Sequence, residues 1–286
     1  MESARRLRAG QARARMLDGG MTPPRSPTGV PAPLFDAEPA AREAPDLSVV
    51  LPMYNEAGNA GRLVREIAAA LSASLPELRF EIVTVDDAST DSTREELVAA
   101  KAEAPLRVLV HARNAGQSRA VRTGVLGARA PLIATLDGDG QNVPADVPAL
   151  YRQLTRADAP PLLAMVAGER QGRQDTRRKL VASRAANALR QALLKDGAGD
   201  TGCGLKVFRR DAFLRLPYFD HLHRYLPALM RREGFEVEFA AVSHRPRTAG
   251  VSKYTNLGRA AVAARDLMGV TWLLARGRSP ERIEEA

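Results

Sequence analysis

Short runs of aliphatic and β-branched residues alternate with amphipathic stretches along the chain from residue 46. Apolar runs of about four to eight residues are typical of buried strands, whereas apolar residues spaced three and four apart are typical of helices. On this basis we predict strands over residues 47–51, 80–85, 106–110 and 132–136. Between them we predict helices over residues 61–75, 91–103 and 117–129. Strands separated by helices of this length form βαβ units, so we expect a parallel sheet.

The second half of the chain has a less regular pattern. It predicts strands over residues 163–167, 205–208 and 235–240, and helices over about 176–194, 224–233 and 257–274. Residues 1–45 are rich in Ala, Arg and Pro without periodicity, which is typical of a disordered tail. We therefore expect a single α/β domain over residues 46–276, with helices flanking a mostly parallel, Rossmann-like sheet, and a C-terminal tail over residues 277–286.

The composition is that of a folded protein with an excess of positive charge. Of the 286 residues, 45% are hydrophobic and 26% charged, and 42 Lys and Arg against 33 Asp and Glu give a net charge of +9. This charge suits nucleic acid, an anionic membrane surface or a phosphate-bearing substrate as a partner. The single cysteine, Cys203, excludes an intramolecular disulfide, and we interpret it as a packing residue rather than a nucleophile. No stretch reaches the roughly 18 apolar residues that a membrane-spanning helix needs.

Carboxylates follow two of the predicted strands. The fourth strand ends in Asp137-Gly138-Asp139-Gly140-Gln141, and ligands of open parallel sheets bind beyond the carboxyl ends of the strands. Hard oxygen ligands in small number are how Mg²⁺ or Mn²⁺ is held when substrate phosphates complete the coordination shell. We therefore expect such an ion here, and the alternative is a solvated Asp/Gly turn.

The second strand ends in Asp86 and Asp87, followed by Ser89 and Asp91. Ser89 or Asp91 could satisfy free N–H groups of the next helix. Two adjacent carboxylates at a buried strand end repel each other unless a cation or hydrogen-bond donors meet them, so capping explains Asp86 and Asp87 poorly. A GxGxxG match at residues 197–202 follows a helix instead of a strand, which disfavours a dinucleotide-binding oxidoreductase.

Four segments together, residues 52–56, 85–91, 114–118 and 137–141, resemble the inverting family 2 glycosyltransferases with a GT-A fold. More narrowly, they resemble polyprenyl-phosphate glycosyltransferases typified by dolichol-phosphate mannose synthase. The resemblance covers about residues 46–275 and implies a single catalytic domain with a nucleotide-binding half (46–142) and an acceptor half (143–276). It implies metal-dependent, inverting transfer of a sugar from a UDP- or GDP-linked donor to a polyprenyl phosphate.

The same resemblance implies roles for individual residues, all of which are expectations at this stage. Nucleotide-sugar binding is expected of Pro52, Tyr54, Glu56, Asp86, Asp87 and Asp137. The metal ion, Mg²⁺ or Mn²⁺, is expected at Asp137, Asp139 and Gln141. Acceptor-phosphate binding is expected of Arg170, Arg178, Lys179, Ser183, Arg247 and Lys253. Catalytic roles are expected of Asp137, Asp139, Arg178 and Lys179.

Two alternative functions stay open. A glycosyltransferase acting on a sugar or protein hydroxyl would need a general base, for which Glu169 and Asp200 are the candidates. A phosphate acceptor needs none, because its second pKa of about 6 makes it largely a dianion at neutral pH. A nucleic-acid-binding protein is disfavoured by the 5% aromatic content and the lack of a recognition motif.

The expected location is cytoplasmic. Peripheral contact with the inner face of the cytoplasmic membrane depends on the last predicted helix, which carries an apolar stripe. At helical spacing such a stripe more often packs in the core. The stripe consists of Leu257, Ala261, Ala264, Met268 and Trp272.

Overall fold

The computed structural model describes residues 44–170, 190–246 and 256–277; for residues 256–261 it describes the backbone alone. Its strands are β1 (Leu47–Met53), β2 (Phe80–Asp86), β3 (Leu106–Val110), β4 (Leu132–Thr135), β5 (Leu163–Arg170), β6 (Lys206–Arg209) and β7 (Glu236–Val242). Its α-helices are α1 (Ala60–Ser74), α2 (Thr93–Ala100), α3 (Gln117–Gly127), α4 (Val147–Thr155), α6 (Arg210–Arg215), α7 (Leu226–Arg232) and α8 (Asn256–Ala275). Two short 3-10 helices are η1 (Pro144–Asp146) and η2 (Leu222–Arg224).

The seven strands form one sheet in the order β3-β2-β1-β4-β6-β5-β7. Strands β1 to β4 are parallel to one another, and β5 is parallel to β7. Only β6 runs antiparallel, against both β4 and β5. The predicted α/β fold with a mostly parallel sheet is therefore confirmed, and the carboxyl ends of β1, β2 and β4 meet at one edge.

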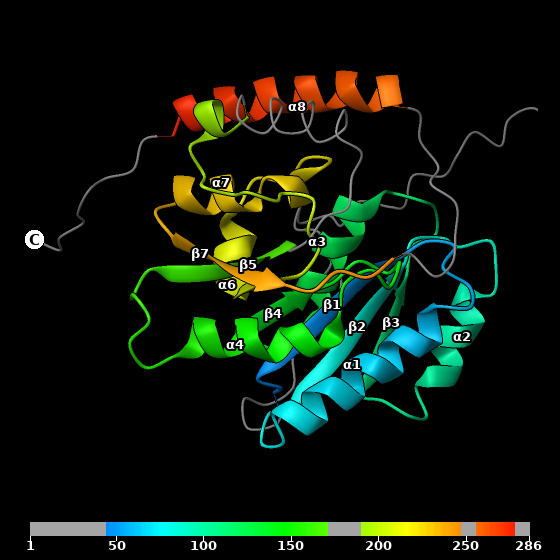
Figure 1. Ribbon diagram of the computed structural model, residues 1–286. Helices are drawn as coiled ribbons and strands as arrows, with labels where there is room; N and C mark the ends of the chain where they lie inside the picture. The colour runs from blue at the N-terminus through cyan, green and yellow to red at the C-terminus, as the bar shows by residue number, and fades with distance from the viewer. Residues whose placement is uncertain (1–43, 171–189, 247–255, 278–286) are drawn as a thin grey trace, which may run out of the picture. The chain divides into compact units, whose positions relative to one another are not determined.

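Helices cover both faces of the sheet (Figure 1). Helices α1, α2 and α4 share one apolar cluster with the sheet, in which Leu63, Ile67 and Leu71 of α1 are fully buried. Helices α3, α6, α7 and α8 share a second cluster on the other face, centred on Phe208 and Phe213. The buried positions of α1 recur every four residues, which is the spacing that predicted the helix.

Several predicted boundaries differ from the structure. Helix α2 starts at Thr93, with Ser92 as its N-cap, and not at residue 91. Asp91 precedes the helix, and its carboxylate accepts the Thr93 N–H (3.0 Å). Helix α4 was not predicted because Pro144 and Pro148 interrupt the pattern, yet proline is tolerated in the first turn of a helix. Helix α6 was also missed.

The described residues contain no helix with both the length and the apolar character required to span a lipid bilayer. Of the helix predicted over residues 176–194, only residues 190–194 are described, and they are helical. Of the predicted tail over residues 1–45, only residues 44 and 45 are described. Of the predicted tail over residues 277–286, only residue 277 is described.

Candidate active site

A cleft of about 1070 Å³ opens at the carboxyl ends of β1, β2 and β4. Seven of the residues predicted from the sequence line it: Pro52, Tyr54, Glu56, Asp87, Asp137, Asp139 and Gln141. Asp86 and Arg170 are described but do not line the cleft. Five predicted residues lie outside the described part of the chain: Arg178, Lys179, Ser183, Arg247 and Lys253.

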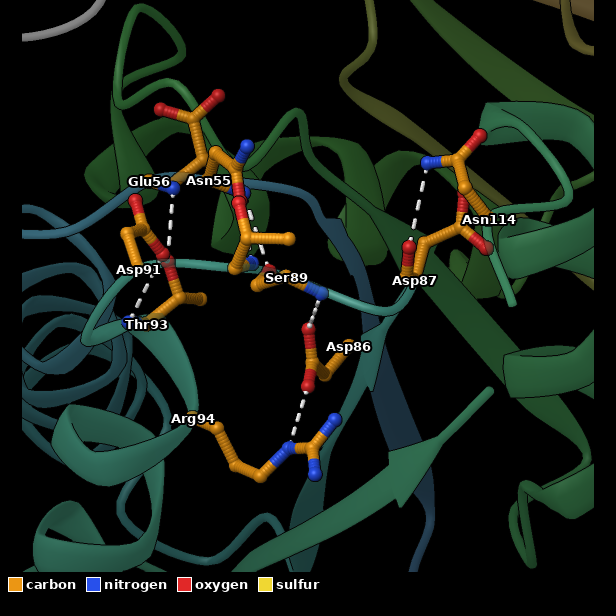
Figure 2. A network of polar contacts seen from close by, with 10 residues as sticks. Asn55, Glu56, Asp86, Asp87, Ser89, Asp91, Thr93, Arg94 and Asn114 are labelled. Atoms are coloured by element: carbon orange, nitrogen blue, oxygen red, sulfur yellow. Dashed lines mark hydrogen bonds and ion pairs between the residues drawn. The ribbon is translucent and has the colours of Figure 1, made fainter. Parts of the chain in front are cut away.

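Asp86 accepts hydrogen bonds that stabilise the loop after β2 (Figure 2). Its fully buried carboxylate accepts hydrogen bonds from the Ser89 N–H (2.9 Å) and the Arg94 guanidinium (2.7 Å). Burial alone would raise the pKa of Asp86, but these donors outweigh it and hold the pKa below its ordinary value. Asp86 therefore stabilises the β2–α2 loop and does not line the cleft, and nucleotide-sugar binding by Asp86 stays a prediction.

The β2–α2 loop in turn holds the loop after β1 (Figure 2). The Asn55 N–H donates to Ser89 Oγ (3.0 Å), and the Thr90 N–H donates back to Asn55 Oδ1 (2.8 Å). The Glu56 N–H donates to Thr93 Oγ1 (2.8 Å). Asn55 has a positive φ of 54°, a conformation that asparagine tolerates better than most residues. These contacts fix the backbone that carries Tyr54 and Glu56 into the cleft.

Asp87 joins β2 to the loop that starts α3. Its carboxylate accepts hydrogen bonds from the N–H groups of Ala115 and Gly116 (2.8 Å each) and lies 2.6 Å from His111 Nδ1. The Asn114 side chain donates to the Asp87 carbonyl at 3.2 Å (Figure 2). Asp87 is only 3% exposed, so the hydrogen-bonding groups of the chain, and not solvent, stabilise most of its carboxylate. Nucleotide-sugar binding by Asp87 stays a prediction.

An acidic pair, Asp137 and Asp139, lies at the end of β4. Asp137 Oδ1 accepts a hydrogen bond from the Gln117 side chain (2.7 Å), and Asp139 Oδ1 accepts one from the Gln141 N–H (3.0 Å). Burial and the neighbouring Asp139 charge raise the pKa of Asp137 from 3.8 to about 6, although Lys206 acts in the opposite sense. Two carboxylates that repel each other in a cleft are stabilised by a cation placed between them.

The donor set fits a divalent ion of the Mg²⁺ or Mn²⁺ kind. No group of three or more His, Cys, Asp or Glu residues suited to a metal occurs among the described residues. The chain would therefore supply two carboxylates and an amide, from Asp137, Asp139 and Gln141. Hard cations bound by so few protein oxygens complete their shell with water and substrate phosphate.

Three basic side chains in the cleft were not predicted: Lys206, His223 and Arg224. The buried Lys206 ammonium donates to the Cys203 carbonyl, and burial lowers its pKa. His223 Nδ1 lies 2.7 Å from Ser118 Oγ, and burial together with nearby cations holds its pKa well below 6.5. A lysine inside the apolar strand β6 was a usable signal, because buried lysines are rare. The pattern gave no such signal for His223 and Arg224.

Residues 48–216, more than half of the chain, match the model of glycosyl transferase family 2. The chain belongs to this family. It is 34% identical over 234 residues to a dodecaprenyl-phosphate galacturonate synthase of Rhizobium johnstonii, covering 80% of this chain and 67% of the relative. It is 35% identical over 227 residues to an undecaprenyl-phosphate 4-deoxy-4-formamido-L-arabinose transferase of Salmonella paratyphi A, covering 78% and 65%. The chain thus spans about two thirds of the length of these relatives.

Solved glycosyltransferase structures share the fold. Glucosyl-3-phosphoglycerate synthase from Mycobacterium tuberculosis, in complex with phosphoglyceric acid, has a TM-score of 0.60 at 18% identity, covering 82% of this chain and 81% of that one. The same enzyme in complex with Mg²⁺ and UDP has a TM-score of 0.59 at 17% identity, covering 83% and 81%. At this identity the likeness establishes the GT-A fold alone.

The two carboxylates considered as general bases are engaged away from the cleft of this glycosyltransferase. Asp200 forms a two-pronged ion pair with Arg170 (2.5 and 2.8 Å), and Glu169 accepts the Gly199 N–H (2.6 Å). Neither lines the cleft. The Arg170 guanidinium already forms an ion pair with Asp200. Acceptor binding by Arg170 stays a prediction. Cys203 is buried, and burial raises its thiol pKa, which supports packing and not nucleophilic attack.

Proposed function

We propose that this family 2 glycosyltransferase moves a sugar from a nucleoside diphosphate to a polyprenyl phosphate, with inversion at the anomeric carbon and with Mg²⁺ or Mn²⁺ at Asp137 and Asp139. The observation that carries the proposal is the acidic pair that lines a cleft large enough for a nucleotide sugar. The names of both relatives, which specify polyprenyl-phosphate acceptors, support it.

The donor nucleotide binds along the β1 side of the cleft in this proposal. Pro52, Tyr54 and Glu56 lie there on a backbone held by the β2–α2 loop. The Tyr54 side chain is 37% exposed, which leaves an aromatic face for the base. The UDP complexes of the structural neighbours favour uridine, and guanosine is the alternative.

Gln117 and the acidic pair act on the diphosphate end. The hydrogen bond from Gln117 fixes the orientation of Asp137, whose carboxylate would hold the ion together with Asp139. When bound, the ion supplies positive charge that stabilises the leaving diphosphate. An acceptor phosphate oxygen bonds to the anomeric carbon as the bond from that carbon to the diphosphate breaks on the opposite face, which inverts the centre.

The acceptor brings its own negative charge, so the enzyme needs cations rather than a general base. We propose that Arg178, Lys179, Ser183, Arg247 and Lys253 contact the acceptor phosphate, with Arg178 and Lys179 contributing most to the rate. The engagement of Glu169 and Asp200 away from the cleft supports a phosphate over a hydroxyl acceptor.

We also propose that α8 contacts the cytoplasmic face of the membrane in which the acceptor lies. Val270 of α8 is buried, whereas Met268 and Trp272 of the predicted stripe are 67% and 61% exposed. These two side chains line an apolar groove with Leu193. Exposed Met and Trp on a helix that also carries Arg265 fit an interfacial position. Flotation of the protein with anionic vesicles tests this, and a Trp272→Glu variant that floats as well as wild type would contradict it.

A comparison of matched acceptors tests the transfer itself. We expect product from undecaprenyl phosphate and none from undecaprenol, which has the same chain but ends in a hydroxyl. Equal use of the alcohol would favour the hydroxyl-directed alternative. The assay uses the full chain, Mg²⁺ or Mn²⁺, and a panel of UDP- and GDP-sugars.

A further inference from the structure

Arg224 lines the cleft, and no acidic side chain of the described part of the chain neutralises it. Within the described residues Arg224 forms no ion pair, although it lines the cleft. Lys206, by contrast, donates to the Cys203 carbonyl and lies in the field of Asp137. Arg170, outside the cleft, is paired with Asp200. An arginine that lines a cleft and has no acidic partner among the described residues is suited to an oxyanion on the ligand.

The η2 turn that carries Arg224 is held from two sides. His221 Nδ1 lies 2.7 Å from Asp266 Oδ2 of α8, and His223 Nδ1 lies 2.7 Å from Ser118 Oγ of α3. The Arg224 N–H donates to the His221 carbonyl at 3.0 Å. Because both anchors come from packed helices, the Arg224 backbone is positioned before any ligand binds, which lowers the entropic cost of binding.

His223 offers a second donor beside Arg224. Ser118 Oγ accepts the backbone N–H of His223 (3.4 Å) and lies 2.7 Å from Nδ1 of its ring. When the serine hydroxyl donates to Nδ1, the ring proton is on Nε2. Burial and the charge of Arg224 keep the imidazole neutral. In this tautomer, a guanidinium and a neutral N–H donor from neighbouring residues line the cleft, a combination suited to a monoanion such as a carboxylate.

We propose that Arg224 and His223 bind a carboxylate on the donor sugar, so that the enzyme selects a nucleoside-diphosphate hexuronate over the matching neutral hexose. This inference rests on the proposed function. The proposed function assigns the other two anions elsewhere: the diphosphate to the ion that Asp137 and Asp139 would hold, and the acceptor phosphate to Arg178 and Lys179. The sugar carboxylate is the anion left for Arg224.

Two pairs of donors that differ only at C6 test the proposal: UDP-galacturonate with UDP-galactose, and UDP-glucuronate with UDP-glucose. We expect wild type to favour one hexuronate over its hexose in kcat/KM, with undecaprenyl phosphate as acceptor. Arg224→Met should reduce that preference about 10- to 100-fold, the value of a hydrogen-bonded charge pair, and Arg224→Lys should restore part of it. Arg215→Met, a change at an exposed arginine outside the cleft, is the matched control.

Calorimetric binding of the four nucleotide sugars, without acceptor, separates this inference from the proposed function. If no lipid product forms with any donor but hexuronate binding is tighter and depends on Arg224, the carboxylate subsite stands and the proposed acceptor is wrong. Wild type that favours the hexose of both pairs overturns the subsite. So does an Arg224→Met variant that loses activity equally with hexose and hexuronate while the KM for undecaprenyl phosphate rises, because Arg224 would then bind the acceptor.

Discussion

Gly204 passes so close to Asp137 that only glycine fits. A Cβ added at Gly204 would lie 2.5 Å from Asp137 Oδ1 and closer still to Cγ and Oδ2. Ordinary van der Waals contact begins at about 3.4 Å, so Gly204→Ala forces the carboxylate to move by about 1 Å. The obstructing atoms are the end of a side chain at an open cleft, which can shift without unfolding the protein. The variant therefore displaces the proposed metal ligand while leaving the fold intact.

A misplacement of about 1 Å at a reacting centre typically costs about 100-fold in rate, or about 2.7 kcal/mol of transition-state stabilisation. We expect Gly204→Ala to lower kcat/KM for the nucleotide sugar by this order and to weaken Mn²⁺ binding, measured by calorimetry. Thermal unfolding should change little.

The matched control is Gly269→Ala on α8, where an added Cβ meets nothing within 4 Å. Since alanine favours helices, this variant should be as active as wild type and as stable or slightly more stable. A Gly204→Ala enzyme with wild-type kcat/KM and Mn²⁺ affinity would refute the placement of the metal at Asp137.

Further predictions concern other parts of the site. Asp139→Ala should abolish transfer without changing the thermal midpoint by more than a few degrees, and wild-type turnover with Mg²⁺ or Mn²⁺ would reject the assignment. Lys179→Ala should raise the KM for undecaprenyl phosphate more than the KM for the donor, and equal changes would argue against it. Because His223 stays neutral when folded, the unfolded chain binds the extra proton and stability falls as pH drops below 6.5, by up to about 1.4 kcal/mol per pH unit. His223→Asn should remove this component. The free energies of unfolding of the two proteins, measured with denaturant, should therefore become more alike from pH 7.5 to 5.5; a constant difference between them would contradict this.

The first half of the fold could be predicted because each element there leaves a local pattern. Strands β1 to β4 and helices α1 to α3 alternate, and alternation of this kind dictates a parallel sheet. The direction of β6 could not be predicted, because an apolar run of four residues does not encode which neighbours it pairs with. Strand order in the second half depends on tertiary packing in the same way.

The residues of the candidate site could likewise be predicted only in part. Asp137 and Asp139 were predictable because they follow a buried strand at the edge where ligands bind. Asp86 and Asp87 could not be told apart, although successive side chains of a strand point to opposite faces. That alternation sends Asp86 to Arg94 and Asp87 to the loop before α3. His223 enters the cleft through a turn whose place is set by distant helices.

The mass of the lipid product tests the central claim most directly. The full chain is incubated with undecaprenyl phosphate, Mg²⁺ or Mn²⁺, and each nucleotide sugar in turn, with Asp139→Ala as the inactive control. We expect one lipid species heavier by a single sugar residue, formed by wild type and absent with the variant. Transfer to a hydroxyl acceptor while undecaprenyl phosphate is left unchanged under every donor would contradict it.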